Sequence, residues 1–172
     1  MARAEFKPDV TASAGEPLRV YNDLRGALRE LELESSEGGN REIWLEFSPN
    51  ASYEPILVRF AFLERGGVLS AIGQLFQIQS EPAEEFGTAL NFLNQELPQY
   101  TFYVAGGADG PEVSVRKDLL PNLRGSPAVH SKEVLQTLTG LCAQKQIFAG
   151  PLQRVAEGAS WRFVKDALKA VR

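Results

Sequence analysis

Few residues in this chain could carry out catalysis. Among its 172 residues, His130 is the single histidine and Cys142 the single cysteine. A nucleophilic triad needs a histidine base, oriented by an acid, beside a nucleophile. His130 precedes Ser131, and Asp118 lies upstream, but Ser131 also suits the N-cap of a helix. An enzyme with a cleft around these three residues is therefore the weakest of our functional hypotheses.

Metal and cofactor chemistry has no matching pattern. One histidine and one cysteine cannot supply the ligand spacing of a zinc site. The glycine pairs at 38/39, 66/67 and 106/107 lack both G-x-G-x-x-G and a P-loop lysine. Glu84 and Glu85 fall in the first turn of a predicted helix, where negative charge favours the helix dipole. We expect no catalytic residue, no metal and no cofactor.

The charge pattern limits the partners. The formal net charge is −4, although residues 126–172 carry seven basic and three acidic side chains. A net-acidic chain without a dense Lys/Arg stripe is a poor binder of nucleic acid. No window approaches the roughly 20 apolar residues that span a bilayer, and the N-terminus lacks the apolar core of a secretory signal. We expect a cytoplasmic protein that binds neither nucleic acid nor membrane.

Helical periodicity appears in four stretches. Leu18 to Leu31 repeats apolar residues at steps of three and four, and Ser80 to Leu97 does the same before Pro98. A third helix should begin near Ser131 and be interrupted at Gly150-Pro151. A last helix over 160–171 shows apolar residues at helical spacing. Residues 1–15 are predicted to be a loose lead-in to one domain spanning 16–172.

Five stretches read as strands. Ile43 to Phe47 alternates apolar and acidic or aromatic residues, which is the period of a half-buried strand. Ile56 to Leu63 and Val68 to Ile78 flank a short turn at Glu64 to Gly67 and should pair as a hairpin. Tyr100 to Val104 and Glu112 to Arg116 flank a second turn and should form another. Leu119 to Pro127 is predicted to be a loop or a loose strand extension.

This order predicts an α+β fold, with a mostly antiparallel five-stranded sheet and helices packed on one face. Both faces of the predicted sheet carry large apolar residues. We assign one set to the helices: Val58, Phe60, Phe62, Val68, Ile72 and Phe76. A second set falls in the opposite phase and is our predicted partner-binding face: Trp44, Leu57, Leu63, Leu69 and Leu75. Either the chain's own terminal segments cover this second set, or a partner does.

The α-β-β-β-α-β-β-α order resembles that of class I type III secretion chaperones and YbjN-type proteins. The local pattern is Leu90 to Pro98, then Tyr100-Thr101-Phe102, then Glu112 to Leu119. It is similar to the Asn-containing helix, strand and V-x-x-D-L strand end of the YbjN type, with a weaker likeness to cyanobacterial and plastid members. The resemblance implies a small acidic protein, often dimeric, that holds a polypeptide or modulates regulation without catalysis. The helix at 160–171 is an addition to that pattern.

Two further hypotheses follow. The leading one is a non-enzymatic, chaperone-like or adaptor protein that binds a polypeptide through the predicted partner-binding face. The alternative is a YbjN-like regulatory homodimer that uses the same face and has no client.

Overall fold

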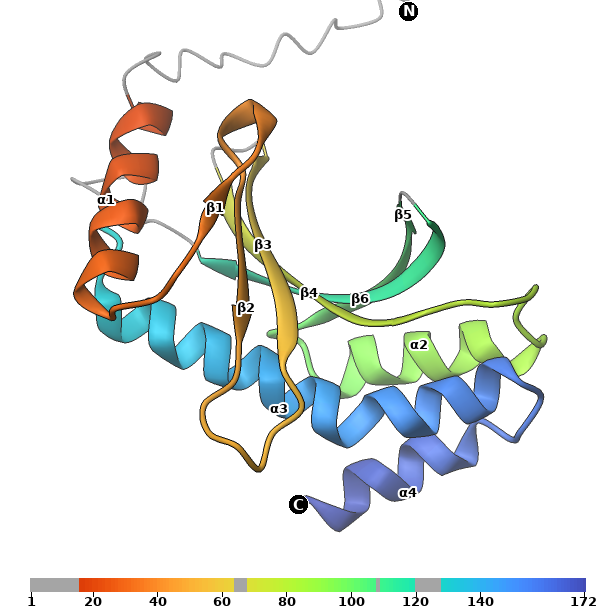
Figure 1. Ribbon diagram of the computed structural model, residues 1–172. Coiled ribbons are helices and arrows are strands. Elements are labelled where there is room, and N and C mark those ends of the chain that lie inside the picture. Colours follow the sequence, from red (N-terminus) through yellow and green to blue (C-terminus); the bar gives the residue numbers. More distant parts are fainter. Residues whose placement is uncertain (1–15, 64–67, 108, 120–127) are drawn as a thin grey trace, which may run out of the picture.

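The computed structural model describes residues 16–63, 68–107, 109–119 and 128–172. Figure 1 shows a curved sheet with the helices gathered on one side. The elements follow in this order: α1 (Glu16–Glu30), β1 (Ser36–Glu37), a 3-10 turn (Gly39–Arg41), β2 (Ile43–Phe47), β3 (Ile56–Leu63), β4 (Val68–Gln77), α2 (Glu85–Glu96), β5 (Thr101–Gly107), β6 (Gly110–Leu119), α3 (Ser131–Ala156) and α4 (Arg162–Ala170). The predicted α+β class is confirmed. The predicted lead-in at 1–15 and the turn at 64–67 lie outside the described residues.

The sheet has six strands in the order β1-β2-β3-β4-β6-β5, and every neighbouring pair is antiparallel. Both predicted hairpins are present, as β3–β4 and β5–β6. The second hairpin joins the sheet through β6, so that β5 forms an edge. The two-residue strand β1 was not predicted, because its residues Ser36 and Glu37 lie in a run with the composition of a turn.

Helix α3 organises the core. It packs against β3, β4 and β6 on one side and against the other three helices. Its buried face includes Leu138, Leu141 and Phe148, and Phe148 meets Phe102 of β5 edge-to-face at a centroid distance of 5.8 Å. Helix α4 packs on α3 and α2. It therefore forms an outer layer on the helical side, and no described helix packs on the opposite face of the sheet.

The predicted interruption at Gly150-Pro151 is wrong, because α3 continues through Pro151 to Ala156. A proline inside a helix removes one backbone hydrogen bond and costs about 3 kcal/mol relative to alanine. The apolar stripe extends past this point, however, and Leu152 and Val155 are fully buried. Packing of these side chains outweighs the local cost of the proline.

Helix α2 starts later than its predicted start at Ser80. Pro82 disfavours helical geometry at the residue before it, and the chain here docks on α3 instead, where the Ala83 N–H donates to the Ala156 carbonyl at 3.0 Å. Glu84 is the N-cap and Glu85 the first helical residue, as expected for acidic residues at that end.

One strand is assigned to the wrong phase by the sequence pattern. The hairpin register pairs Phe60 with Ala71 and Phe62 with Leu69, so Leu69 faces the helices and is buried. Leu75 is also in the core, beside an irregularity in the β4–β6 register between Gln74 and Phe76. Leu69 and Leu75 therefore do not share a face with Trp44 and Leu57. The parity of residue numbers changes across this hairpin, and the alternation within one strand cannot reveal that change.

Proline 151 supplies a test of the continuous helix. Replacing it by alanine restores a donor to the Ile147 carbonyl without touching the buried stripe. We expect Pro151→Ala to raise the free energy of unfolding by roughly 1–3 kcal/mol, measured by urea denaturation. An unchanged or lower free energy of unfolding would contradict a helix that is continuous through position 151.

Candidate functional site

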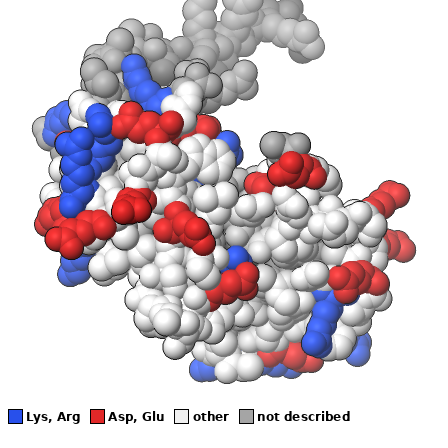
Figure 2. All heavy atoms as spheres, in the orientation of Figure 1, with Lys and Arg blue, Asp and Glu red and all other residues white. Residues whose placement is uncertain are grey.

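The side of the sheet away from the helices, here called the open face, combines aromatic, aliphatic and charged side chains. Because side chains alternate along each strand, the registers place these residues on it: Trp44, Glu46, Leu57, Arg59, Ser70, Ile72, Gln74, Tyr103, Ser114, Arg116 and Asp118. Leu57 is 41% exposed. The acidic side chains are scattered over the view in Figure 2, and the basic ones lie mainly toward its margins.

Two arginines on the open face are each held by an acid. The Arg59 guanidinium lies 3.2 Å from a Glu42 carboxylate oxygen and stacks over the Trp44 ring at 5.4 Å. Arg116 Nε lies 3.1 Å from Asp118 Oδ1, but its N–H does not point along that line, so the contact is electrostatic and not a hydrogen bond. The Asp118 carboxylate instead accepts a hydrogen bond from Ser70 Oγ at 2.7 Å.

Tyr103 is half-buried on β5 next to this charged network. Burial raises the pKa of its phenol above its usual value, and the positive charges of Arg59 and Arg116 partly oppose that shift. The hydroxyl therefore stays protonated at neutral pH, as a neutral hydrogen-bonding group on the β5 side of the face.

A groove of about 630 Å³ opens beside the Trp44 end of the open face, and we call it the β2 groove. Its residues are Glu34, Ser35, Ser36, Trp44, Leu45, Glu46, Ser48, Pro55 and Leu57. One wall is the segment that enters β1, the other is β2, and Leu57 of β3 contributes apolar surface. Its volume lies in the range typical of ligand pockets.

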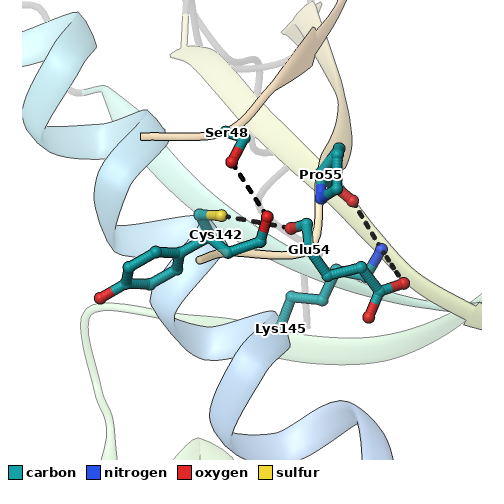
Figure 3. Close-up of polar contacts among 6 residues, drawn as sticks. Ser48, Glu54, Pro55, Cys142 and Lys145 are labelled. Atoms are coloured by element: carbon teal, nitrogen blue, oxygen red, sulfur yellow. Dashed lines mark hydrogen bonds and ion pairs between the residues drawn. The ribbon is translucent and has the colours of Figure 1, made fainter. Parts of the chain in front are cut away.

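The loop between β2 and β3 forms one end of this groove and is tied to α3 (Figure 3). Lys145 Nζ donates to the Pro55 carbonyl at 2.7 Å and pairs with the Glu54 carboxylate at 3.1 Å. The Cys142 thiol donates to the Glu54 carbonyl at 3.6 Å. Inside the loop, Ser48 Oγ donates to the Tyr53 carbonyl at 3.0 Å. Burial raises the pKa of the Cys142 thiol, so it remains a protonated donor at neutral pH.

The predicted partner-binding face is thus divided. Trp44 and Leu57 both line the β2 groove, whereas Leu69 and Leu75 are buried under the helices. Leu63 ends β3, and its side chain lies outside the described part of the chain. Whether any of these residues binds a partner stays a prediction.

Sequence reasoning missed the two groove carboxylates, Glu34 and Glu46. Glu46 was visible as an outward position of an alternating strand, but Glu34 lies in a segment whose pairing depends on the unforeseen strand β1. Arg59 interrupts the otherwise apolar run of β3. A charged residue inside such a run is itself a signal, since burying it requires a partner, and here Glu42 fills that role.

The three residues of the enzyme hypothesis show no catalytic arrangement. His130 is the exposed N-cap of α3, which makes Ser131 the first helical residue and not the N-cap that we predicted. Within the described ranges the His130 side chain makes no hydrogen bond, and Asp118 is engaged on the sheet by Ser70 and Arg116. Among the residues that the structure describes, there is no group of three or more potential metal ligands.

In the described segments, no helix is both long enough and apolar enough to span a bilayer.

Comparison with known proteins gives a likeness of fold. No family model and no curated protein matches the chain. The solved structures include a similar one, "Crystal structure of YbjN, a putative transcription regulator from E. coli", with a TM-score of 0.48 and 12% sequence identity. The similarity covers 87% of this chain and 92% of that one. At this identity the likeness concerns the fold alone.

The charged network on the open face predicts that the stability of the protein changes at alkaline pH. Because the pKa of Tyr103 is raised on folding, the unfolded chain loses this proton first, and the free energy of unfolding should fall as the pH rises above about 10. Tyr103→Phe should weaken that fall. Arg59→Gln should raise the pKa of Tyr103 further, because it removes the largest opposing charge. Ultraviolet absorbance titration against Tyr103→Phe isolates this phenol, with the exposed Arg162→Gln as control. An ordinary pKa for Tyr103 would contradict the described packing.

Proposed function

We propose that this protein is a non-enzymatic, chaperone-like or adaptor protein that binds a polypeptide through the β2 groove and the adjoining open face. The observation that carries the proposal is Leu57, which is 41% exposed at the groove beside Trp44, on a sheet face that no described helix covers. A large apolar side chain held open next to a tryptophan is typical of an interaction surface.

The composition of the surface supports a protein partner. Tryptophan, tyrosine and arginine are enriched among the residues that dominate binding energy at interfaces. Trp44 and Arg59 lie opposite each other on the neighbouring strands β2 and β3 of this face, and Tyr103 lies on its β5 edge. Arg59 is already oriented by Glu42 and by the Trp44 ring. Binding would therefore cost little side-chain entropy at this position.

Site-specific crosslinking tests the proposal in the producing cells. A photoreactive phenylalanine analogue at position 57 should crosslink to a polypeptide, and the same analogue at position 171 should not. Val171 is an equally apolar and exposed position, but it lies beyond α4, away from the groove. Trp44→Ala should reduce the yield from position 57 by about tenfold or more, the loss expected for a binding hot spot. Equal crosslinking from both positions, or none from position 57, would contradict the proposal.

Self-association is a second candidate, and one feature favours it. The Asn94 side chain of α2 bonds to both backbone groups of Phe102, accepting from its N–H at 2.7 Å and donating to its carbonyl at 3.0 Å. The backbone N–H and carbonyl of Phe102 therefore point away from β6. By alternation, the backbone groups of Val104 and Gly106 do so too. Val104 is 44% exposed. Within the described residues, the outward backbone groups of Val104 and Gly106 have no partner, and a free strand edge of this kind is a template for pairing with a second copy, as in a regulatory homodimer.

Val104→Pro tests this candidate. Its N–H points away from β6, so proline removes the outward donor while the ladder to β6 keeps its bonds. A dimer formed through this edge should become a monomer in light scattering over a range of concentrations. An unchanged dimer would exclude the edge, and a monomeric wild type would exclude self-association.

A further inference from the structure

Strand β1 is only two residues long, and like charges lie beyond its end. β1 pairs Glu37 with Ile43 and Ser36 with Trp44. Two residues further along, the same register would place Glu34 directly opposite Glu46 on the same face. Like charges directly across a strand pair are destabilising. The ladder ends at Ser36, and both Glu34 and Glu46 line the β2 groove beyond it.

Glu34 and Glu46 are both exposed residues of the groove lining. Nearby basic side chains are already engaged: Arg59 with Glu42 at 3.2 Å, and Arg25 with Glu37 at 2.8 Å. Within the part of the chain that the structure describes, neither Glu34 nor Glu46 forms an ion pair. A cation placed between the walls would therefore meet two carboxylates that are not neutralised internally.

The floor of the groove determines which cation fits. Trp44 and Leu57 line the same groove as the two carboxylates and supply apolar surface there. A lysine or arginine side chain matches this arrangement, because its aliphatic stem packs on apolar groups while its charged end reaches the acids. A metal ion fits poorly, since hard cations take six or more oxygen ligands and gain nothing from an apolar floor.

The edge of β2 indicates that the cation belongs to an extended chain. The Gly38 N–H donates to the Glu42 carbonyl at 2.8 Å, so even-numbered residues of β2 direct their backbone groups toward β1. At Glu46, β1 is no longer present, and the backbone N–H and carbonyl face the groove. An extended peptide can pair with these groups while its side chains alternate into the groove and out of it.

We propose that the β2 groove selects an extended segment of a partner protein in which an arginine or lysine is flanked by apolar residues. This inference rests on the proposed polypeptide-binding function and specifies the chemistry of the partner. Glu34 and Glu46 recognise the cationic end, and Trp44 and Leu57 recognise the apolar surface.

Binding of two matched synthetic peptides tests the inference. One is a short fluorescent peptide that alternates arginine and valine, and the other carries citrulline, which is neutral and nearly isosteric, in place of each arginine. Fluorescence anisotropy should show that the wild type prefers the arginine peptide by tenfold or more, and that raising the ionic strength weakens this preference. The double variant Glu34→Gln/Glu46→Gln should lose the preference and bind both peptides equally. The control Glu81→Gln/Glu84→Gln removes two exposed charges near α2 and should retain it.

The outcomes separate the two levels of the proposal. If both peptides bind the wild type equally and Trp44→Ala weakens both, the groove binds polypeptide but does not select a cation, and this inference is wrong. If neither peptide binds, the polypeptide-binding function fails at this groove and the inference fails with it. A preference that survives Glu34→Gln/Glu46→Gln would place cation recognition elsewhere and also overturn the inference.

Discussion

Burial of helix α3 against the sheet is the constraint on which the rest of the molecule depends. One 26-residue helix contacts three strands and all the other helices. It is long enough to do so because it continues through Pro151. Since α1, α2 and α4 also pack on α3, the helical layer forms on one side, and hydrophobic burial on that side leaves the other face of the sheet to charged and aromatic residues.

The sequence was sufficient to predict the helices and most strands, but not the register in which the strands pair. Strong periodicity predicted the order of helices and the two hairpins, because these depend on local patterns. The predicted orientation of β4 was wrong. The register of a hairpin decides which alternating set of side chains faces inward, and Val68 to Leu75 carries apolar residues in both sets. Pro151 misled for a related reason: its local cost is evident in the sequence, whereas the buried contacts of Leu152 and Val155 are not.

The candidate site divides in the same way. Trp44 and Leu57 were identified because they fall in the phase opposite to the helix-facing residues, on strands that were correctly assigned. Glu34 could not be identified, because its importance comes from the residue across a ladder that stops before reaching it. A site formed where pairing fails leaves no periodic pattern in the sequence. It becomes visible only when the register of the neighbouring strand is known.

The loop that closes one end of the groove gives the site a property of its own. Cys142 and Lys145 hold the backbone of Glu54 and Pro55 against the most deeply buried helix of the fold. The end wall of the groove therefore shares the rigidity of the core, although it belongs to a surface loop. A partner that enters the groove has little loop motion to arrest, so more of the contact energy remains as affinity.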